Sequence, residues 1–150
     1  MVSRQLLKTV SFPAGSKPHM LSVSPDGKEV WVQTAEANTN VVLDASDLSV
    51  LATQPTGKQP VTNAWTRDRR YSVVTNGHDT FAQIFDARTF REVKRLTIGQ
   101  GGANIGFSQD GKTAFIAVRG ANEVAVIDLD KLTLASRITA GTEPQGLIVR

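Results

Sequence analysis

Few residues of this 150-residue chain have side chains that could do chemistry. The chain has no cysteine, which removes disulfides, thiolate metal sites and cysteine nucleophiles together. Its two histidines are His19 and His78, and His78 is followed directly by Asp79. An imidazole can ligate a metal ion or move a proton, but one imidazole makes no site, and no second ligand stands at a metal-site spacing. The sequence therefore predicts no catalytic residue and no metal-ligand set.

The overall composition indicates a folded domain with a weak net charge. Charged residues make up 21% and apolar residues 40% of the chain, and the formal net charge is +3. A charge this small, spread over this length, does not make the basic patch that nucleic-acid binding needs. The longest apolar run, Ala114 to Val118, is far shorter than a membrane span. We therefore expect neither a nucleic-acid partner nor a membrane-spanning segment.

The elements that position the remaining polar residues follow from an internal repeat of 42 residues. Several columns keep this spacing without a gap: a hinge glycine, a residue three positions later that is Pro or Gly, two aspartates and an apolar residue. The hinge column is Gly15, Gly57, Gly99 and Gly141, and the two aspartate columns are Asp26, Asp68 and Asp110 and Asp44, Asp86 and Asp128. A fixed period of this length is typical of repeat architectures.

Each repeat reads as four short strands. In the first repeat they are expected at about 19–23, 29–34, 39–44 and 49–53, as β-branched and aromatic runs separated by Gly, Asn, Asp and Ser clusters. Four strands in about forty residues are typical of a β-propeller blade. The predicted fold is all-β: a β-propeller of four-stranded antiparallel blades, with about three and a half blades present. Blade repeats are expected at about 18–59, 60–101 and 102–143, with partial-blade strands at 6–12 and 144–150.

The repeat resembles a known family, the YVTN-type β-propeller repeats. The resemblance rests on the turn Ser24-Pro25-Asp26-Gly27-Lys28, on Val73-Val74-Thr75-Asn76, on Val124-Ala125-Val126-Ile127-Asp128 and on the Gly-x-x-Pro hinges. It implies a lactonase-like or surface-layer-like propeller, commonly exported in bacteria, and hence a periplasmic or extracellular location. It also implies seven or eight blades, supplied either by a longer parent chain or by several copies in a homo-oligomer. With its outer blade faces uncovered, the chain alone is expected to associate or to be marginally stable.

In a propeller, two of the four connections in each blade reach one face, around the mouth of the central channel. Loops held there by a rigid scaffold are where binding groups are expected. The candidate ligand-binding residues on this face are His19, Thr62, Asn63, His78, Asp79, Asn104 and Gln145. Their amides, imidazoles and carboxylate suit a small polar ligand or a bound cation, although no motif specifies a cofactor.

Three functions are compatible with such a site. The first is a non-catalytic binding or scaffold module that engages a protein or a small ligand through the channel-mouth loops. The second is a lactonase-like hydrolase with a channel-bound divalent cation. The third, which rests on resemblance alone, is a haem- or quinone-linked redox accessory protein. Because acidic residues around the channel are sparse, the sequence favours the binding module over an enzyme.

Two local expectations concern the backbone. The hinge glycines Gly57, Gly99 and Gly141 are expected at positive φ, because the chain turns sharply there from the outer to the inner strand. The turn Thr66 to Arg70 lacks the Pro and Gly of its counterparts. It is therefore expected to be looser, with its arginines in solvent.

Overall fold

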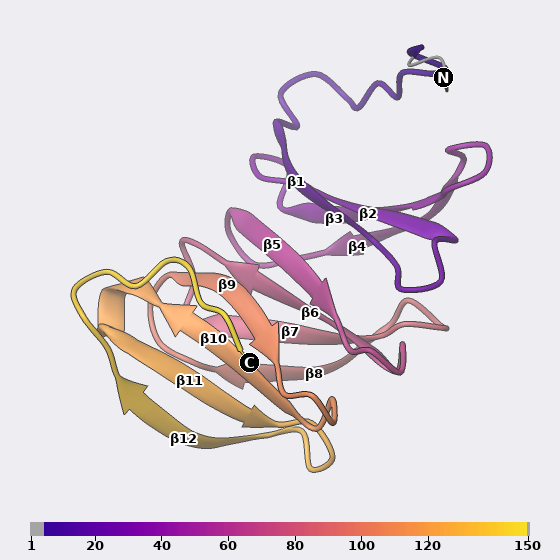
Figure 1. The fold of residues 1–150 in the computed structure, drawn as a ribbon. Coiled ribbons are helices and arrows are strands. Elements are labelled where there is room, and N and C mark those ends of the chain that lie inside the picture. Colours follow the sequence, from indigo (N-terminus) through magenta and orange to yellow (C-terminus); the bar gives the residue numbers. More distant parts are fainter. Residues whose placement is uncertain (1–4, 150) are drawn as a thin grey trace.

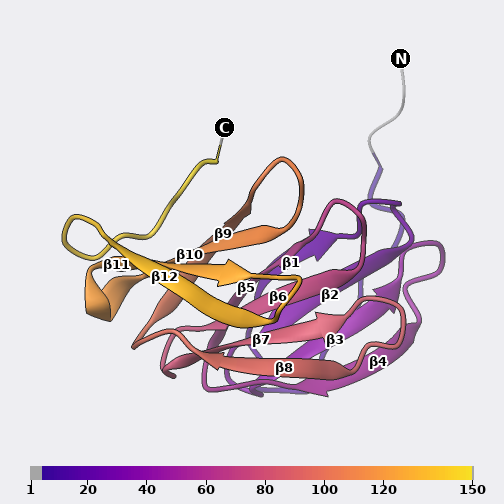
Figure 2. The same cartoon turned by 90° about the horizontal axis from the view of Figure 1, so that it is seen from below.

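The chain forms three four-stranded antiparallel sheets, which lie side by side in the order of the sequence (Figure 1). The structure, a computed structural model, describes residues 5–149. Each sheet is built from four consecutive strands, and within a sheet each strand pairs with the strands next to it in sequence. Figure 2 shows the same sheets from below, with the first strands β1, β5 and β9 on the same side of the three sheets. This arrangement is that of propeller blades around a channel, as the repeat predicted.

The strands keep the 42-residue period of the sequence. The first blade consists of β1 (Pro18–Val23), β2 (Glu29–Thr34), β3 (Thr39–Asp44) and β4 (Val50–Pro55). The second consists of β5 (Pro60–Trp65), β6 (Tyr71–Asn76), β7 (Phe81–Asp86) and β8 (Glu92–Thr97). The third consists of β9 (Gly102–Phe107), β10 (Thr113–Val118), β11 (Glu123–Asp128) and β12 (Thr133–Thr139), with the short 3₁₀ turn η1 (Arg119–Ala121) between β10 and β11.

The expected partial-blade strands at 6–12 and 144–150 are not strands in the described residues; Arg150 lies outside them. A strand needs a hydrogen-bonded neighbour, and neither segment has a full one. In the first segment, Val10 and Phe12 pack against the open face of the first blade. The second runs back beside β9 (Figure 1), where the amide of Asn104 donates to the carbonyl oxygen of Gln145 at 3.3 Å.

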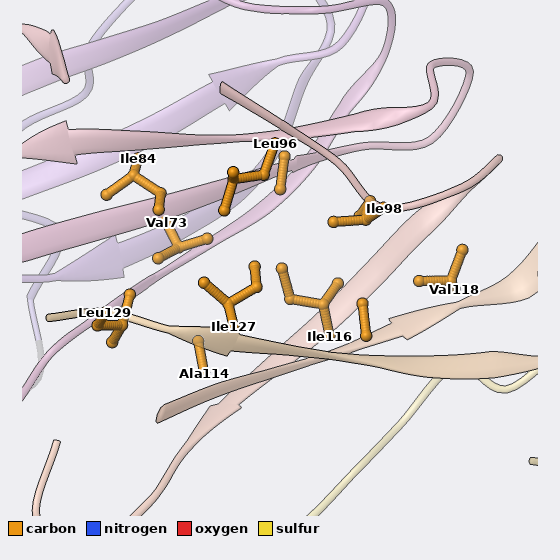
Figure 3. Packing of buried hydrophobic residues seen from close by; sticks show 11 residues of the cluster. Val73, Ile84, Leu96, Ile98, Ala114, Ile116, Val118, Ile127 and Leu129 are labelled. Carbon is orange, nitrogen blue, oxygen red and sulfur yellow. The ribbon is translucent and has the colours of Figure 1, made fainter. Parts of the chain in front are cut away.

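Aliphatic side chains join the second and third blades. Figure 3 shows Val73 and Ile84 of the second blade facing Ile116 and Ile127 of the third. All four side chains are fully buried. Covering a side chain of this size contributes about 1.5–3 kcal/mol, so burial of these side chains is a large part of the free energy that holds the two blades together.

The first and second blades meet through a mixed interface. Trp31 is fully buried, and its ring packs edge-on against Trp65, with 4.6 Å between the ring centroids, and against Phe85. Beside these rings, buried amides form a network in which Gln33 Nε2 donates to Asn63 Oδ1 at 2.6 Å. Polar groups buried in this way must be paired, so the network specifies how the two blades align.

The turn Thr66 to Arg70 is as tight as its counterparts, contrary to expectation. The amide of Arg69 donates to the carbonyl oxygen of Thr66 at 2.9 Å, which matches the bond from Gly27 to Ser24 in the first blade. Arg69 adopts the left-handed conformation that glycine takes there, with φ of 58°.

The side chain of Arg69 is not left in solvent. Its guanidinium contacts the carboxylates of Asp26 and Glu29 in the neighbouring blade. Burial raises the pKa of Glu29, and the positive charge of Arg69 opposes that rise. The ion pairs between blades give a reason for a non-glycine residue at this strained position.

The hinge glycines do not share one conformation. Gly99 has φ of +109°, but Gly57 and Gly141 are not at positive φ, so that expectation is wrong for these two. At Gly57 the requirement is space, because a Cβ would lie 2.7 Å from Asp79 Oδ2. The left-handed residue common to the four hinges lies two positions later in each repeat: Lys17, Gln59, Gly101 and Glu143.

We predict that Gly99→Val destabilises the protein by about 1–3 kcal/mol, because a β-branched residue is strained at this φ. A Cβ there would also lie 3.1 Å from Val118 Cγ1. Gly141→Val is the matched control: it has the same place in the repeat, no positive φ and open space around it. Thermal unfolding measures both variants, and equal melting temperatures for the two would contradict the prediction.

We predict that Arg69→Gln lowers the free energy of unfolding by about 2–3 kcal/mol at neutral pH, since it leaves Glu29 buried without a cation. Burial raises the pKa of Glu29 above its usual value of 4.5, so the folded state holds that proton more tightly than the unfolded chain. The loss of unfolding free energy in Arg69→Gln should therefore be small below pH 4.5 and should grow as the pH rises through the folded-state pKa of Glu29.

The control for this variant is Arg67→Gln, which removes an exposed arginine from the same turn. Subtracting the two stability profiles across pH removes the contribution of the carboxylates that Arg69 does not contact, and leaves those of Glu29 and Asp26. Because the pKa of Asp26 is lowered, its contribution changes at lower pH than that of Glu29. A deficit that stays constant with pH would show that Arg69 does not act through Glu29.

Candidate functional site

A hollow of about 330 Å³ lies where the inner strands of the three blades begin. It is lined by His19, Gln59, Pro60, Val61, Ala103, Asn104, Arg119 and Gln145. The walls come from β1, β5 and β9, from the hinge before β5, from η1 and from the segment after β12. Three residues singled out from the sequence, His19, Asn104 and Gln145, are brought together here although they are far apart in the chain.

His19 stands exposed at the start of β1 and is oriented by the second blade. Its Nδ1 lies 3.2 Å from the carbonyl oxygen of Val61. A carbonyl only accepts, so Nδ1 is the donor, and in the neutral ring the lone pair of Nε2 is free for a ligand. The neighbouring blade thus holds the imidazole in one orientation at the rim of the hollow.

Asn104 and Gln145 supply amide groups at the other wall. Both residues are exposed, and their backbones are tied together by the bond from Asn104 to Gln145. Within residues 5–149, neither side-chain amide has a protein hydrogen-bond partner. Each can therefore both donate to and accept from a bound molecule.

Arg119 was not among the residues expected from the sequence. It begins η1, and within the described chain its guanidinium lies within 4 Å of no carboxylate. Its Nε is buried without a hydrogen-bond partner. The sequence does carry a signal, because the equivalent residues one and two repeats earlier are Gly77 and Ala35, so an arginine replaces a small residue in this column.

Thr62 and Asn63 are not part of the hollow's wall. Asn63 is buried in the network between the blades, where it accepts from Gln33 and donates to Ser72 Oγ at 3.2 Å. Thr62 is half-buried, and its hydroxyl donates to the backbone carbonyl of Asn63 at 3.4 Å.

His78 and Asp79 lie next to the hollow rather than in it. His78 lines a second depression of about 360 Å³, which shares Gln59 with the first. Asp79 Oδ2 accepts from the backbone amide of Lys58 at 2.6 Å, so its carboxylate stabilises the hinge before β5. The other nearby carboxylate, Glu36, pairs with Lys17 at 2.9 Å.

Most aspartates of the protein are used in turns at the opposite ends of the strands. Hydrogen bonds from Thr89 hold the pKa of Asp86 below its usual value, and the bond from Ser108 does the same for Asp110. Among residues 5–149, no carboxylate lines the hollow. In the described part of the chain, no three His, Cys, Asp or Glu side chains come together as a metal site. Nor does any helix among residues 5–149 have the length and apolar character needed to cross a bilayer.

Solved structures similar to this chain are β-propellers. Hydrazine synthase from Kuenenia stuttgartiensis superimposes with a TM-score of 0.82 at 24% identity over 95% of this chain. The WD40 repeats of RRP9 give 0.80 at 11% identity over 88%, and a 6-phosphogluconolactonase-like protein from Bacteroides uniformis gives 0.80 at 20% over 93%. The chain spans 41%, 41% and 45% of these three structures.

These similarities establish the fold. No protein-family model matches the chain, and no curated protein matches it either. Propellers carry out many unrelated functions, so the activity must be argued from the site.

We predict that Asn63→Ala destabilises the protein and that Asn104→Ala does not. Asn63→Ala should cost about 1–3 kcal/mol, because it leaves Gln33 without one of its buried partners. Asn104→Ala should change the free energy of unfolding by less than about 0.5 kcal/mol. Denaturant unfolding measures both, and an equal loss in the two variants would show that Asn104 has a structural role.

Proposed function

We propose that this chain is a non-catalytic binding module that engages its ligand through the channel-mouth hollow. The observation that carries the proposal is the convergence of free hydrogen-bonding groups from His19, Asn104 and Gln145 on one concave surface. Strands β1 and β9 position His19 and Asn104, and the segment after β12 positions Gln145 beside them. Concave sites with a few placed polar groups are the usual form of a small-molecule site.

The hydrolase alternative finds less support in the same surface. A channel-bound divalent cation needs oxygen ligands, chiefly carboxylates. Glu36 and Asp79 are the carboxylates beside the hollow, and each is already bound within the protein. The observed lining suits recognition of a ligand better than activation of a water molecule.

We also propose that this chain is part of a longer propeller that is exported from the cytoplasm. The YVTN-type resemblance supports a place within a longer propeller, exported to the periplasm or the cell exterior. The share of each solved propeller that this chain covers, 41–45%, supports the same interpretation. Further blades would cover the open apolar face where Val10 and Phe12 now lie.

A binding screen with a turnover control tests this function. We expect neutral polar fragments, such as amides and sugars, to shift the backbone amide resonances of His19, Asn104 and Gln145. The double variant Asn104→Ala/Gln145→Ala should lose the response. Gln109→Ala is the control, because it removes an exposed amide from a turn at the far ends of the strands.

The turnover control uses simple lactones with Ca²⁺ or Zn²⁺ added. We expect no hydrolysis above the buffer rate. Metal-dependent hydrolysis by the wild-type chain, lost in the double variant, would replace the binding module with the hydrolase.

A further inference from the structure

Arg119 places a positive charge where the other blades have none. The 42-residue column that contains it holds Ala35 in the first blade and Gly77 in the second. The column lies at the end of the second strand of each blade, next to the channel mouth. The third blade therefore has a long, positively charged side chain at a position where the other two blades have a small residue.

The second blade leaves room for this side chain. A Cβ on Gly77 would lie 3.3 Å from Nη2 of Arg119 and 2.9 Å from Val61 Cγ2. Gly77 is buried and is not at positive φ, so the backbone does not require glycine there. Glycine at this position keeps open the space that the guanidinium occupies.

The charge of Arg119 has no partner in the described part of the protein. Arg69, which is also half-buried, is paired with Asp26 and Glu29 through its Nη atoms, although its Nε is buried without a partner. Among residues 5–149, Arg119 has no carboxylate within 4 Å, and its Nε is likewise buried without a hydrogen-bond partner. A half-buried cation with no counter-charge is costly, and at the wall of a hollow it favours binding of an anion.

The neighbours of Arg119 complete a set of hydrogen-bond donors. The side-chain amides of Asn104 and Gln145 line the same hollow and can donate to an anion, while the free Nε2 of the neutral His19 ring accepts from another part of the ligand. Among residues 5–149, no carboxylate lines the hollow to repel an anion. A guanidinium binds carboxylate and phosphate through two parallel hydrogen bonds. A volume of about 330 Å³ suits a small molecule.

We propose that the hollow is an oxyanion site, in which Arg119 recognises the carboxylate or phosphate group of a small ligand. The inference rests on the proposed binding function and adds the chemical class of the ligand to it. His19, Asn104 and Gln145 contact the rest of the bound molecule, and Gly77 provides the space for the guanidinium.

The test is a titration of the 150-residue chain, followed by backbone amide and arginine Nε–H resonances at constant ionic strength. The probes are sodium malonate and sodium phosphate, with malonamide and glycerol as uncharged counterparts. We expect saturable shifts at Arg119, Asn104 and Gln145 with an anion, and binding of its neutral counterpart in the same hollow that is weaker by about tenfold or more. Arg119→Gln should weaken binding by about tenfold or more, and Arg119→Lys, which keeps the charge and loses the planar fork, by less.

Two further variants separate recognition from structure. Arg67→Gln removes an exposed arginine at the far ends of the strands and should leave anion binding unchanged. Gly77→Ala should weaken anion binding by crowding the guanidinium without altering any charge. The melting temperature of Arg119→Gln should equal or exceed that of wild type, and a loss of several degrees would assign Arg119 a structural role and overturn the proposal.

The possible outcomes are distinguishable. Binding of malonate alone identifies a carboxylate site, binding of phosphate alone a phosphate site, and binding of both the shared oxyanion chemistry. If malonamide binds as well as malonate and Arg119→Gln changes nothing, the oxyanion inference fails while the binding module stands. If neither these probes nor the neutral fragments bind in the hollow, both proposals fail.

Discussion

Burial of sheet faces between neighbouring blades is the constraint on which the rest of this structure depends. A single four-stranded sheet with two apolar faces is not stable in water, and each blade here is stabilised by the blade beside it. Ile84 and Ile116 are fully buried at one interface and Trp31 at the other. Because the faces must pack, the inner strands β1, β5 and β9 come to lie side by side, and the hollow forms where they begin.

The two interfaces meet this constraint with different chemistry. Between the second and third blades the contact is mainly aliphatic, with one buried hydrogen bond from Thr75 Oγ1 to the carbonyl oxygen of Ala103 at 2.8 Å and an ion pair between Arg70 and Asp130 at 3.0 Å. Between the first and second blades, aromatic rings are combined with the amides of Gln33 and Asn63 and with the ion pairs of Arg69. Buried polar groups lose their partners if the blades shift, so this interface also specifies the alignment on which the orientation of His19 depends.

Charged groups are divided between the two ends of the strands. At one end, aspartates such as Asp86 and Asp110 accept hydrogen bonds from turn residues, which holds their pKa values below the usual range. At the other end, Asp79 and Glu36 are bound within the protein, and among residues 5–149 no carboxylate lies within 4 Å of the Arg119 guanidinium at the hollow. The channel-mouth end thus offers hydrogen-bond donors and a positive charge to a ligand, while the opposite end stabilises the fold.

The sequence by itself determined the blades, because strand periodicity, turn residues and the 42-residue repeat are local properties. It also identified the channel-mouth end, and with it His19, Asn104 and Gln145. Tertiary structure decided which polar groups on that end are free: Asn63 and Asp79 are used by neighbouring segments, whereas Arg119 is not. Hydrogen bonds and ion pairs between blades join residues about twenty to forty positions apart. Whether such a partner exists depends on how the blades pack, which no local pattern encodes.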